Sequence, residues 1–161
     1  MDPQTVNEGV VVRTLGFTTL ANPDRATVDI ILIHGLQGHP RNTWLYSSPT
    51  EKPPFFRRFG RRKLRSQDAE PQETFWPLDI LPRDFPDARI MTYGYDSHIT
   101  HWFKGSAMQL DIDQYGEGLL SAMETCRRDN PHRPLILIAH SLGGLILKDI
   151  SLQSNTIVPR N

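Results

Sequence analysis

The amino-acid sequence predicts an α/β fold in which a largely parallel sheet is flanked by helices. Three apolar runs rich in β-branched residues, 27–35, 88–95 and 133–140, are typical of strands that are buried on both faces. Helical segments follow the second and third of these runs. Strands that alternate with helices in this way favour right-handed crossovers and a single parallel sheet.

The totals are compatible with one globular domain. The chain has 161 residues, of which 38% are hydrophobic, so it can bury a core of its own. Lysine and arginine together number 18, as do aspartate and glutamate. The resulting net charge of zero gives no electrostatic reason to expect nucleic acid as a partner.

The cysteine count, the N-terminal residues and the lengths of the apolar runs indicate the compartment of the protein. Cys126 is the only cysteine, so an intrachain disulfide is excluded and a reducing compartment is expected. The first ten residues carry neither a basic region nor an apolar core of a secretory signal, and no apolar run reaches the length of about 18 residues that a membrane span needs. We therefore expect an intracellular, cytoplasmic chain without a transmembrane segment.

The first half of the chain predicts strands around a long insertion. Residues 9–15 (GVVVRTL) and 27–35 (TVDIILIHG) are predicted to be strands. Residues 46–75 are rich in proline, charge and glutamine, and predict a loop or disordered insertion. The predicted organisation is an N-terminal strand region (1–26), a partial domain (27–153) that includes the insertion, and a tail (154–161).

The second half predicts helices around two strands. Short helical turns punctuated by prolines are predicted over 75–86, before the strand 88–95. A longer helix is predicted to begin after Ser106 as N-cap, with one apolar face. Its apolar positions are Met108, Ile112, Tyr115, Leu119 and Ala122. The strand 133–140 and a helix beginning with LGGLILKDI complete the series.

The turn AHSLGG, between that last strand and helix, has the pattern of a nucleophile elbow. Such a turn holds its serine in a cramped conformation, so the residues two before and two after must be small, and here they are Ala139 and Gly143. The usual first residue of the pattern is glycine rather than alanine. Ser141 would lie at the carboxyl end of the sheet, and the N–H of Leu142 would face a developing oxyanion. The alternative is a small-residue turn that only packs tightly.

A second glycine-containing turn, HGLQG, follows the strand 27–35. Acyl transfer needs a second oxyanion donor at this end of the sheet, and the N–H of Leu36 is the candidate. Gly35 and Gly38 allow a close approach of the backbone. His34 is predicted to organise this oxyanion loop rather than to act as a base.

Three segments together carry a resemblance to a known family. HGLQGHPRNTW, FWPLDILPRDFPDARIMTYGYDS and LILIAHSLGGLILK resemble the lipase-like α/β-hydrolase domain of the serine-active-site-containing protein family. They are also similar to the hydrolase-like domains at the N-terminus of fungal NACHT-type receptors. The resemblance covers roughly residues 27–150. It implies an α/β-hydrolase fold, Ser141 as nucleophile, Leu36 and Leu142 as oxyanion donors, lipid or ester chemistry, and mitochondrial or endoplasmic-reticulum membranes.

The base and acid of a catalytic triad are not assigned by the sequence. In this fold the order is serine, acid, histidine, and only residues 142–161 follow Ser141. The sequence therefore indicates a domain truncated after the elbow helix and impaired as an enzyme. Asp96, His98 and His101 follow the strand 88–95 and are weak alternatives, because a loop of solvated polar residues accounts for them more simply.

Other patterns yield no site. His98, His101 and His39 lack the three or four convergent ligands of a zinc centre, so no metal and no cofactor are expected. The basic run 57–65 resembles a localisation or lipid-binding patch, but its proline- and glutamine-rich surroundings favour a solvated insertion. Trp44 and Trp102 are expected to pack between loops and sheet, with an acyl pocket as the alternative.

Two functional hypotheses result. The first is a serine esterase or lipase-like hydrolase that acts on an ester or lipid-like small molecule. The second is a non-catalytic interaction or signalling module that binds a protein partner over an open edge of the sheet, where the strand 133–140 would otherwise expose apolar residues.

Overall fold

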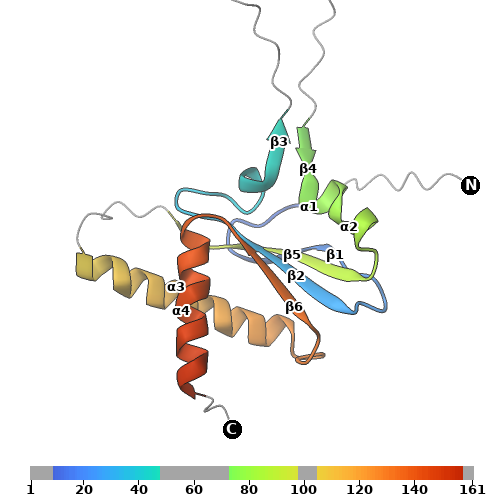
Figure 1. Cartoon of the computed structure of the whole chain (residues 1–161). Helices are drawn as coiled ribbons and strands as arrows, with labels where there is room; N and C mark the ends of the chain where they lie inside the picture. The colour runs from blue at the N-terminus through green and yellow to red at the C-terminus, as the bar shows by residue number, and fades with distance from the viewer. Residues whose placement is uncertain (1–8, 48–72, 98–104, 158–161) are drawn as a thin grey trace, which may run out of the picture.

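The computed structural model describes residues 9–47, 73–97 and 105–157 as a mixed α/β fold with a mostly parallel sheet and flanking helices (Figure 1). The strands are β1 (Gly16–Ala21), β2 (Val28–Ile33), β3 (Leu45–Ser47), β4 (Glu73–Phe75), β5 (Ala88–Gly94) and β6 (Leu135–Ala139). The helices are the 3-10 turn η1 (Asn42–Trp44), α1 (Trp76–Asp79), α2 (Leu81–Asp84), α3 (Gly105–Cys126) and α4 (Leu142–Ile157).

The main sheet has the strand order β1-β5-β2-β6. β2 is central and pairs in parallel with β5 on one side and with β6 on the other. β1 pairs with β5 in the antiparallel sense, so the sheet is mixed at that edge. The predicted strands 27–35, 88–95 and 133–140 are therefore confirmed, and each is trimmed by the structure at its ends.

The two faces of the sheet are both covered, because alternate side chains of each strand point to opposite faces. Ile31 and Ile33 of β2 belong to one apolar cluster, which α3 and α4 cover with Leu119 and Ile146. On the other face, Ile30, Leu32 and Ile90 pack with residues from the loop after β2 and from β4, notably Trp44 and Phe75. This two-sided burial explains why the strand sequences are nearly continuous apolar runs.

Helices α3 and α4 cross over one face of the sheet (Figure 1). At the crossing, a Cβ on Gly116 of α3 would lie 3.3 Å from Asp149 Oδ2 and 3.4 Å from Ile150 Cγ1 of α4. The predicted apolar face of α3 is confirmed for Ile112 and Leu119, which are buried. The glycine lets the two helices approach, although glycine inside a helix costs about 1 kcal/mol relative to alanine.

The predicted first strand, 9–15, is wrong. Residues 10–15 form no strand, and Val11 is 82% exposed. The strand instead begins at Gly16, whose φ of 77° turns the chain into antiparallel pairing with β5. The valines gave a strong local strand signal, but only the segment after the glycine finds a partner.

The boundaries of the insertion also differ from the prediction. Residues 45–47 and 73–75 pair as β3 and β4 in a separate two-stranded antiparallel sheet. The predicted loop or disorder over 48–72 lies outside the described residues. The predicted helical turns over 75–86 are confirmed as α1 and α2, each with a proline in its first turn.

Candidate functional site

Ser141 occupies a left-handed backbone conformation between β6 and α4. Its φ is 52°, a value that residues other than glycine rarely adopt and that costs on the order of 1–3 kcal/mol. Three hydrogen bonds hold the turn: the His140 N–H donates to the Ile33 carbonyl (3.0 Å), that of Gly143 to the His140 carbonyl (3.0 Å), and that of Gly144 to the Ser141 carbonyl (2.9 Å). The strained serine itself is exposed at the carboxyl end of the sheet.

Gly143 brings the first turn of α4 against the end of β2. A Cβ at this position would lie 2.7 Å from the carbonyl oxygens of both His34 and Ile33. Backbone atoms of a central strand have little freedom to retreat, so no larger residue fits. The small-residue pattern of the turn therefore has a physical cause in the distance between the helix and β2.

Gly35 brings the loop after β2 beside the serine. A Cβ on Gly35 would lie 2.8 Å from Ser141 Cβ and 2.8 Å from the His140 carbonyl oxygen. Gly38 closes the same loop, because its N–H donates to the Gly35 carbonyl at 3.0 Å. The two glycine-containing turns predicted from the sequence thus meet at one place.

Leu36 directly follows Gly35 and Leu142 directly follows Ser141, so their N–H groups belong to the two turns that meet here. Leu142 is the first residue of α4, where N–H groups have no acceptor within the helix and carry the positive end of its dipole. The Leu36 N–H makes no hydrogen bond within the described part of the chain. Neither N–H therefore has a hydrogen-bond acceptor within the described residues.

His34 is occupied by structural bonds. It is fully buried, its Nε2 accepts the Tyr95 N–H at 3.3 Å, and its Nδ1 lies 2.9 Å from the Gly35 carbonyl oxygen. An acceptor at Nε2 places the proton on Nδ1, which donates to that carbonyl. Burial lowers the pKa of His34, with the neighbouring His39 adding to the effect and the Gly35 bond opposing it. The neutral ring therefore fastens the loop on which Gly35 lies.

Residues 34–40, here called the oxyanion loop after the role predicted for them, are held by β5 and the residues that follow it. The Tyr95 hydroxyl donates to the His34 carbonyl at 2.9 Å, and Thr92 Oγ1 donates to the Pro40 carbonyl at 2.8 Å. The Gln37 N–H donates to the Ser97 carbonyl at 3.2 Å. Thr92 of β5, and Tyr95 and Ser97 after it, were not among the predicted site residues. A tyrosine at the end of a buried strand is a usable signal, because a buried phenol needs a polar partner.

The His140 ring packs against a tryptophan of the loop after β2. It lies edge-on to Trp44 with the centroids 6.4 Å apart, and Trp44 packs against Trp76 at 5.7 Å. Trp44 is 7% exposed and belongs to the apolar cluster on the sheet face opposite α3 and α4. Packing between loop and sheet, the first expectation for Trp44, is what the structure shows; Trp102 lies outside the described residues.

The structure shows no contact between Ser141 and the weak alternatives for base and acid, of which only Asp96 is among the described residues. Asp96 is exposed, two residues after the end of β5, and His98 and His101 lie outside the described residues. Within the ranges 9–47, 73–97 and 105–157, no side chain forms a hydrogen bond with the Ser141 hydroxyl. No group of three metal-ligating side chains converges in those ranges either.

A cavity of about 300 Å³ lies against the outer side of the oxyanion loop. It is mixed in character, with apolar walls from Leu15, Pro40 and Tyr95 and polar groups from the other residues. The remaining lining residues are Thr14, Gly38, His39, Asp96 and Ser97. A recess at the carboxyl end of a parallel sheet is the usual location of a ligand site in α/β proteins.

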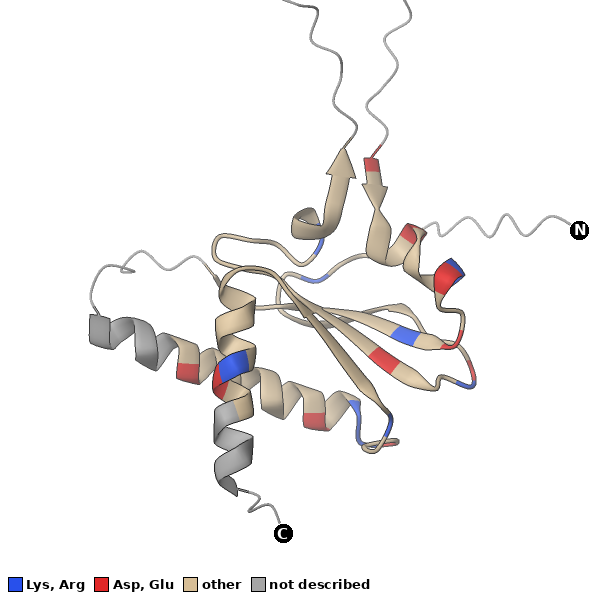
Figure 2. Cartoon of the chain, in the orientation of Figure 1, with Lys and Arg blue, Asp and Glu red and all other residues tan. Residues whose placement is uncertain are grey.

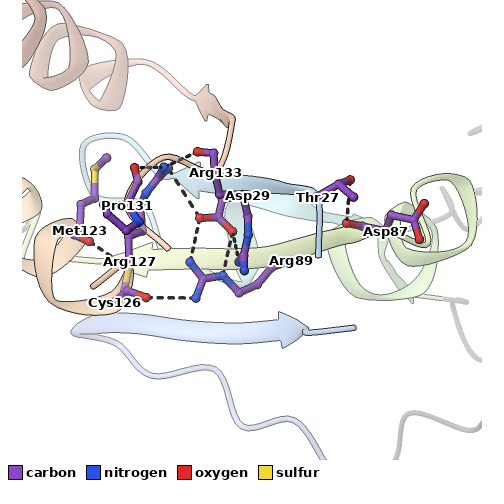
Figure 3. A network of polar contacts seen from close by, with 9 residues as sticks. All are labelled: Thr27, Asp29, Asp87, Arg89, Met123, Cys126, Arg127, Pro131 and Arg133. Atoms are coloured by element: carbon purple, nitrogen blue, oxygen red, sulfur yellow. Dashed lines mark hydrogen bonds and ion pairs between the residues drawn. The ribbon is translucent and has the colours of Figure 1, made fainter. Parts of the chain in front are cut away.

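Residues 134–147, which include the serine turn, contain no Lys, Arg, Asp or Glu. Charged residues lie on the helices and loops elsewhere (Figure 2), and one cluster of them lies at the opposite end of the sheet. Asp29, at the start of β2, is fully buried and lies within 4.0 Å of three guanidinium groups (Figure 3). Arg89 donates two hydrogen bonds to its carboxylate, both at 2.8 Å, and Arg133 donates one at 3.0 Å. Arg127 completes the set at 3.6 Å.

This carboxylate stays ionised in the fold. Burial alone would raise the pKa of Asp29, but the hydrogen bonds and charges of Arg89 and Arg133 outweigh it, and the pKa is lowered. The group ties β2, β5, the end of α3 and the entry to β6 together. It lies at the amino end of β2 and takes no part in the serine site.

Among curated proteins, the chain is similar to Protein SERAC1, the serine-active-site-containing protein, of several vertebrates. It is 29% identical to the human protein over 165 residues, an alignment that covers 97% of this chain and 23% of the relative. The mouse protein is 28% identical, covering 85% and 23%, and the Danio rerio protein is 27% identical, covering 78% and 18%. The chain thus spans less than a quarter of the length of these relatives.

These homologues support the serine-active-site resemblance and give no support to the resemblance to NACHT-type receptors. No family model matches the chain, and no solved structure matches it. Within the described residues, none of the helices has the length and apolar character required to cross a membrane.

Proposed function

We propose that the chain carries the nucleophile and the oxyanion donors of a serine hydrolase of the esterase or lipase type, on an α/β-hydrolase fold. The observation that supports this most directly is the left-handed Ser141, exposed between β6 and α4. Strain of this kind persists only where the surroundings enforce it, and it concentrates at functional sites. The name of the relatives, serine-active-site-containing protein, fits the same function.

In the proposed reaction the Ser141 hydroxyl attacks the carbonyl carbon of an ester. The N–H groups of Leu36 and Leu142 bind the oxygen that becomes negative as the tetrahedral intermediate forms. The alcohol leaves with a proton, an acyl-serine remains, and water then releases the acid. The oxyanion donors belong to backbone held by glycine contacts, so they need little reorganisation at the moment of reaction.

A general base is the part of the mechanism that the described residues do not supply. Asp96, His98 and His101, which follow β5 in the sequence, remain the candidates of this chain. A serine hydrolase without its base retains roughly 10³–10⁴-fold catalysis over water, as measured in a protease. We therefore expect slow turnover from the 161-residue chain and measurable reactivity of the serine.

The substrate proposed is an uncharged or lipid-like ester. The serine turn itself carries no charged side chain, and the cavity beside residues 38–40 has a mixed lining; both fit such a molecule. Association with mitochondrial or endoplasmic-reticulum membranes belongs to the same proposal, and fractionation of cells that express the protein tests it.

The decisive test is labelling by a fluorophosphonate, which reacts with activated serines. The folded chain is expected to be labelled, the variant Ser141→Ala is not, and the variant Ser151→Ala, which alters a serine further along α4, is labelled like the wild type. A series of p-nitrophenyl esters of increasing acyl length then ranks the substrates. A well-folded wild-type chain labelled no faster than Ser141→Ala would overturn the hydrolase proposal.

A second function, a non-catalytic interaction or signalling module of the receptor-associated kind, has one observation in its favour. β6 is an outer strand of the described sheet, and its Ile136 is 49% exposed. An apolar strand with a free edge is a template for pairing with another chain. A photo-crosslinker placed at residue 136 is expected to capture a protein in cells, whereas one at the exposed Val11 is not. Equal capture at both positions would argue against this module.

A further inference from the structure

We propose that Tyr95 is a positioning residue that holds the oxyanion loop in register with Ser141. The inference rests on the proposed function and names a residue that neither the sequence patterns nor the similarity to SERAC1 assigns to the site. Tyr95 follows β5 directly, and its hydrogen bonds go to His34 rather than to the serine or the oxyanion donors. Its role would act through His34.

Tyr95 contacts His34 in three ways. Its N–H donates to Nε2 at 3.3 Å, its hydroxyl donates to the carbonyl oxygen at 2.9 Å, and the two rings stack with centroids 4.4 Å apart and planes 8° from parallel. Both residues are buried, at 7% and 0% exposure. Burial also raises the pKa of the Tyr95 hydroxyl well above its usual range, so the phenol remains a donor.

The His34 carbonyl is the point at which these contacts reach the site. It accepts the Tyr95 hydroxyl, and it is one of the two oxygens that a Cβ on Gly143 would meet at 2.7 Å. The peptide group that contains this carbonyl continues into Gly35, which lies against Ser141. A rotation of that peptide would shift both the donor loop and its contact with the first turn of α4.

The rest of the oxyanion loop contains a strained residue and is fixed by contacts from β5 and the residues after it. Gln37 has a φ of 49°, the second left-handed residue other than glycine in the described chain. Its N–H is tied to the Ser97 carbonyl at 3.2 Å, and Thr92 Oγ1 fixes the Pro40 carbonyl at 2.8 Å. Tyr95 therefore secures the half of the loop next to the serine, while its neighbours secure the other half.

Tyr93 provides a matched control. It lies two residues earlier on β5, is 8% exposed, and stacks on Tyr95 with centroids 6.3 Å apart. Among the described residues its hydroxyl forms no hydrogen bond with the oxyanion loop, and it lies 3.7 Å from the position that a Cβ on Gly118 would take. The changes Tyr93→Phe and Tyr95→Phe remove the same atom from similar surroundings, and only the second removes a bond to the loop.

The experiment compares the two variants in the full chain by two measurements. The first is the second-order rate of fluorophosphonate labelling of folded protein. Loss of one oxyanion donor costs about 10²–10³ in rate, so displacement of the loop in Tyr95→Phe is expected to slow labelling by about tenfold or more. Tyr93→Phe is expected to stay within about twofold of the wild type, the range of an ordinary substitution away from a site. Equal labelling rates for both variants would overturn the positioning role.

The second measurement does not require Ser141 to react. Amide hydrogen exchange at Gly38, whose N–H donates to the Gly35 carbonyl, is expected to accelerate in Tyr95→Phe and not in Tyr93→Phe. The ¹⁵N shifts of the His34 ring are expected to change only in Tyr95→Phe. If the wild type is not labelled, the hydrolase proposal fails, and these spectra alone decide the inference. Unchanged exchange at Gly38 would overturn it whatever the labelling shows.

Discussion

Gly35 and Ser141 lie so close that a single methyl group on the glycine would come within 2.8 Å of the serine Cβ. The contact joins two turns that follow different strands, β2 and β6, which pair in parallel. Neither turn can move without the other. The loop after β2 and the turn at Ser141 are therefore coupled by this contact, and the coupling can be measured through stability as well as through reactivity.

The strain at Ser141 predicts that glycine is more stable there. Ser141→Gly is expected to raise the free energy of unfolding by about 1 kcal/mol, because glycine adopts a positive φ without steric cost. Ser141→Ala keeps a Cβ and is expected to stay within about 0.5 kcal/mol of the wild type. Urea titration of the three proteins measures the difference. Equal stability of the glycine and alanine variants would show that the conformation is not strained.

The two adjacent glycines of α4 predict opposite effects. Gly143→Ala is expected to lower the free energy of unfolding by about 2 kcal/mol, because the new Cβ would meet two backbone oxygens at 2.7 Å. Gly144→Ala has nothing within 4 Å of its Cβ and is expected to raise stability by up to about 1 kcal/mol. Denaturant midpoints of the pair test this directly, and a neutral Gly143→Ala would contradict the close approach of helix and strand.

The buried carboxylate of Asp29, at the end of the sheet opposite Ser141, is expected to contribute strongly to the free energy of unfolding. Asp29→Asn is expected to lower the free energy of unfolding by about 3 kcal/mol, because three guanidinium groups would lose their counter-charge. The exposed pair of Arg41 and Glu73 offers a control: Glu73→Gln is expected to change stability by less than about 1 kcal/mol.

The loss of stability in Asp29→Asn depends on pH, in a direction set by the lowered pKa of Asp29. Because the pKa of Asp29 is lowered below 3.8, its contribution is fully present above that pH and is lost as the pH falls through the native value. The stability gap between wild type and Asp29→Asn is therefore expected to narrow only in strong acid. A gap that already closes near neutral pH would contradict the assignment.

His34 predicts a second pH dependence, in a different range. Its pKa is lowered below 6.5 by burial, so the unfolded chain binds more protons than the folded chain as the pH falls below 6.5. Stability is expected to be full above that pH and to decline on acidification, by at most about 1.4 kcal/mol per pH unit. His34→Gln should remove this component, whereas His132→Gln, at an exposed loop position, should keep it. Urea titrations at several pH values decide between the two.

Much of the fold was predictable because its central strands, β2 and β5, are buried on both faces. β2, β5 and β6 are apolar along nearly their whole length, and short apolar runs of this kind, bounded by turn residues, are typical of central strands in α/β sheets. The turn around Ser141 was predictable for a related reason, since small residues at fixed spacing reflect a steric requirement that the structure shows at Gly143.

The features that could not be predicted depend on contacts between residues that are far apart in the sequence. The valines before Gly16 have strand propensity but no neighbour to pair with, so the first strand was misplaced. Asp29 meets Arg89 and Arg133 across separations of 60 and 104 residues, which no local pattern encodes. The hold of Tyr95 on His34 is of the same kind, at a separation of 61 residues.

The central place of β2 also governs how the chain must fold. Residues 28–33 can complete their pairing only with residues 88–93 and 135–139, so large loops have to close before the core strand gains either neighbour. Non-local parallel pairing of this kind is slow, on the order of milliseconds to seconds in small domains. Until β6 arrives, one edge of the central strand is without its partner, and during synthesis that interval lasts until the ribosome has delivered residues 135–139.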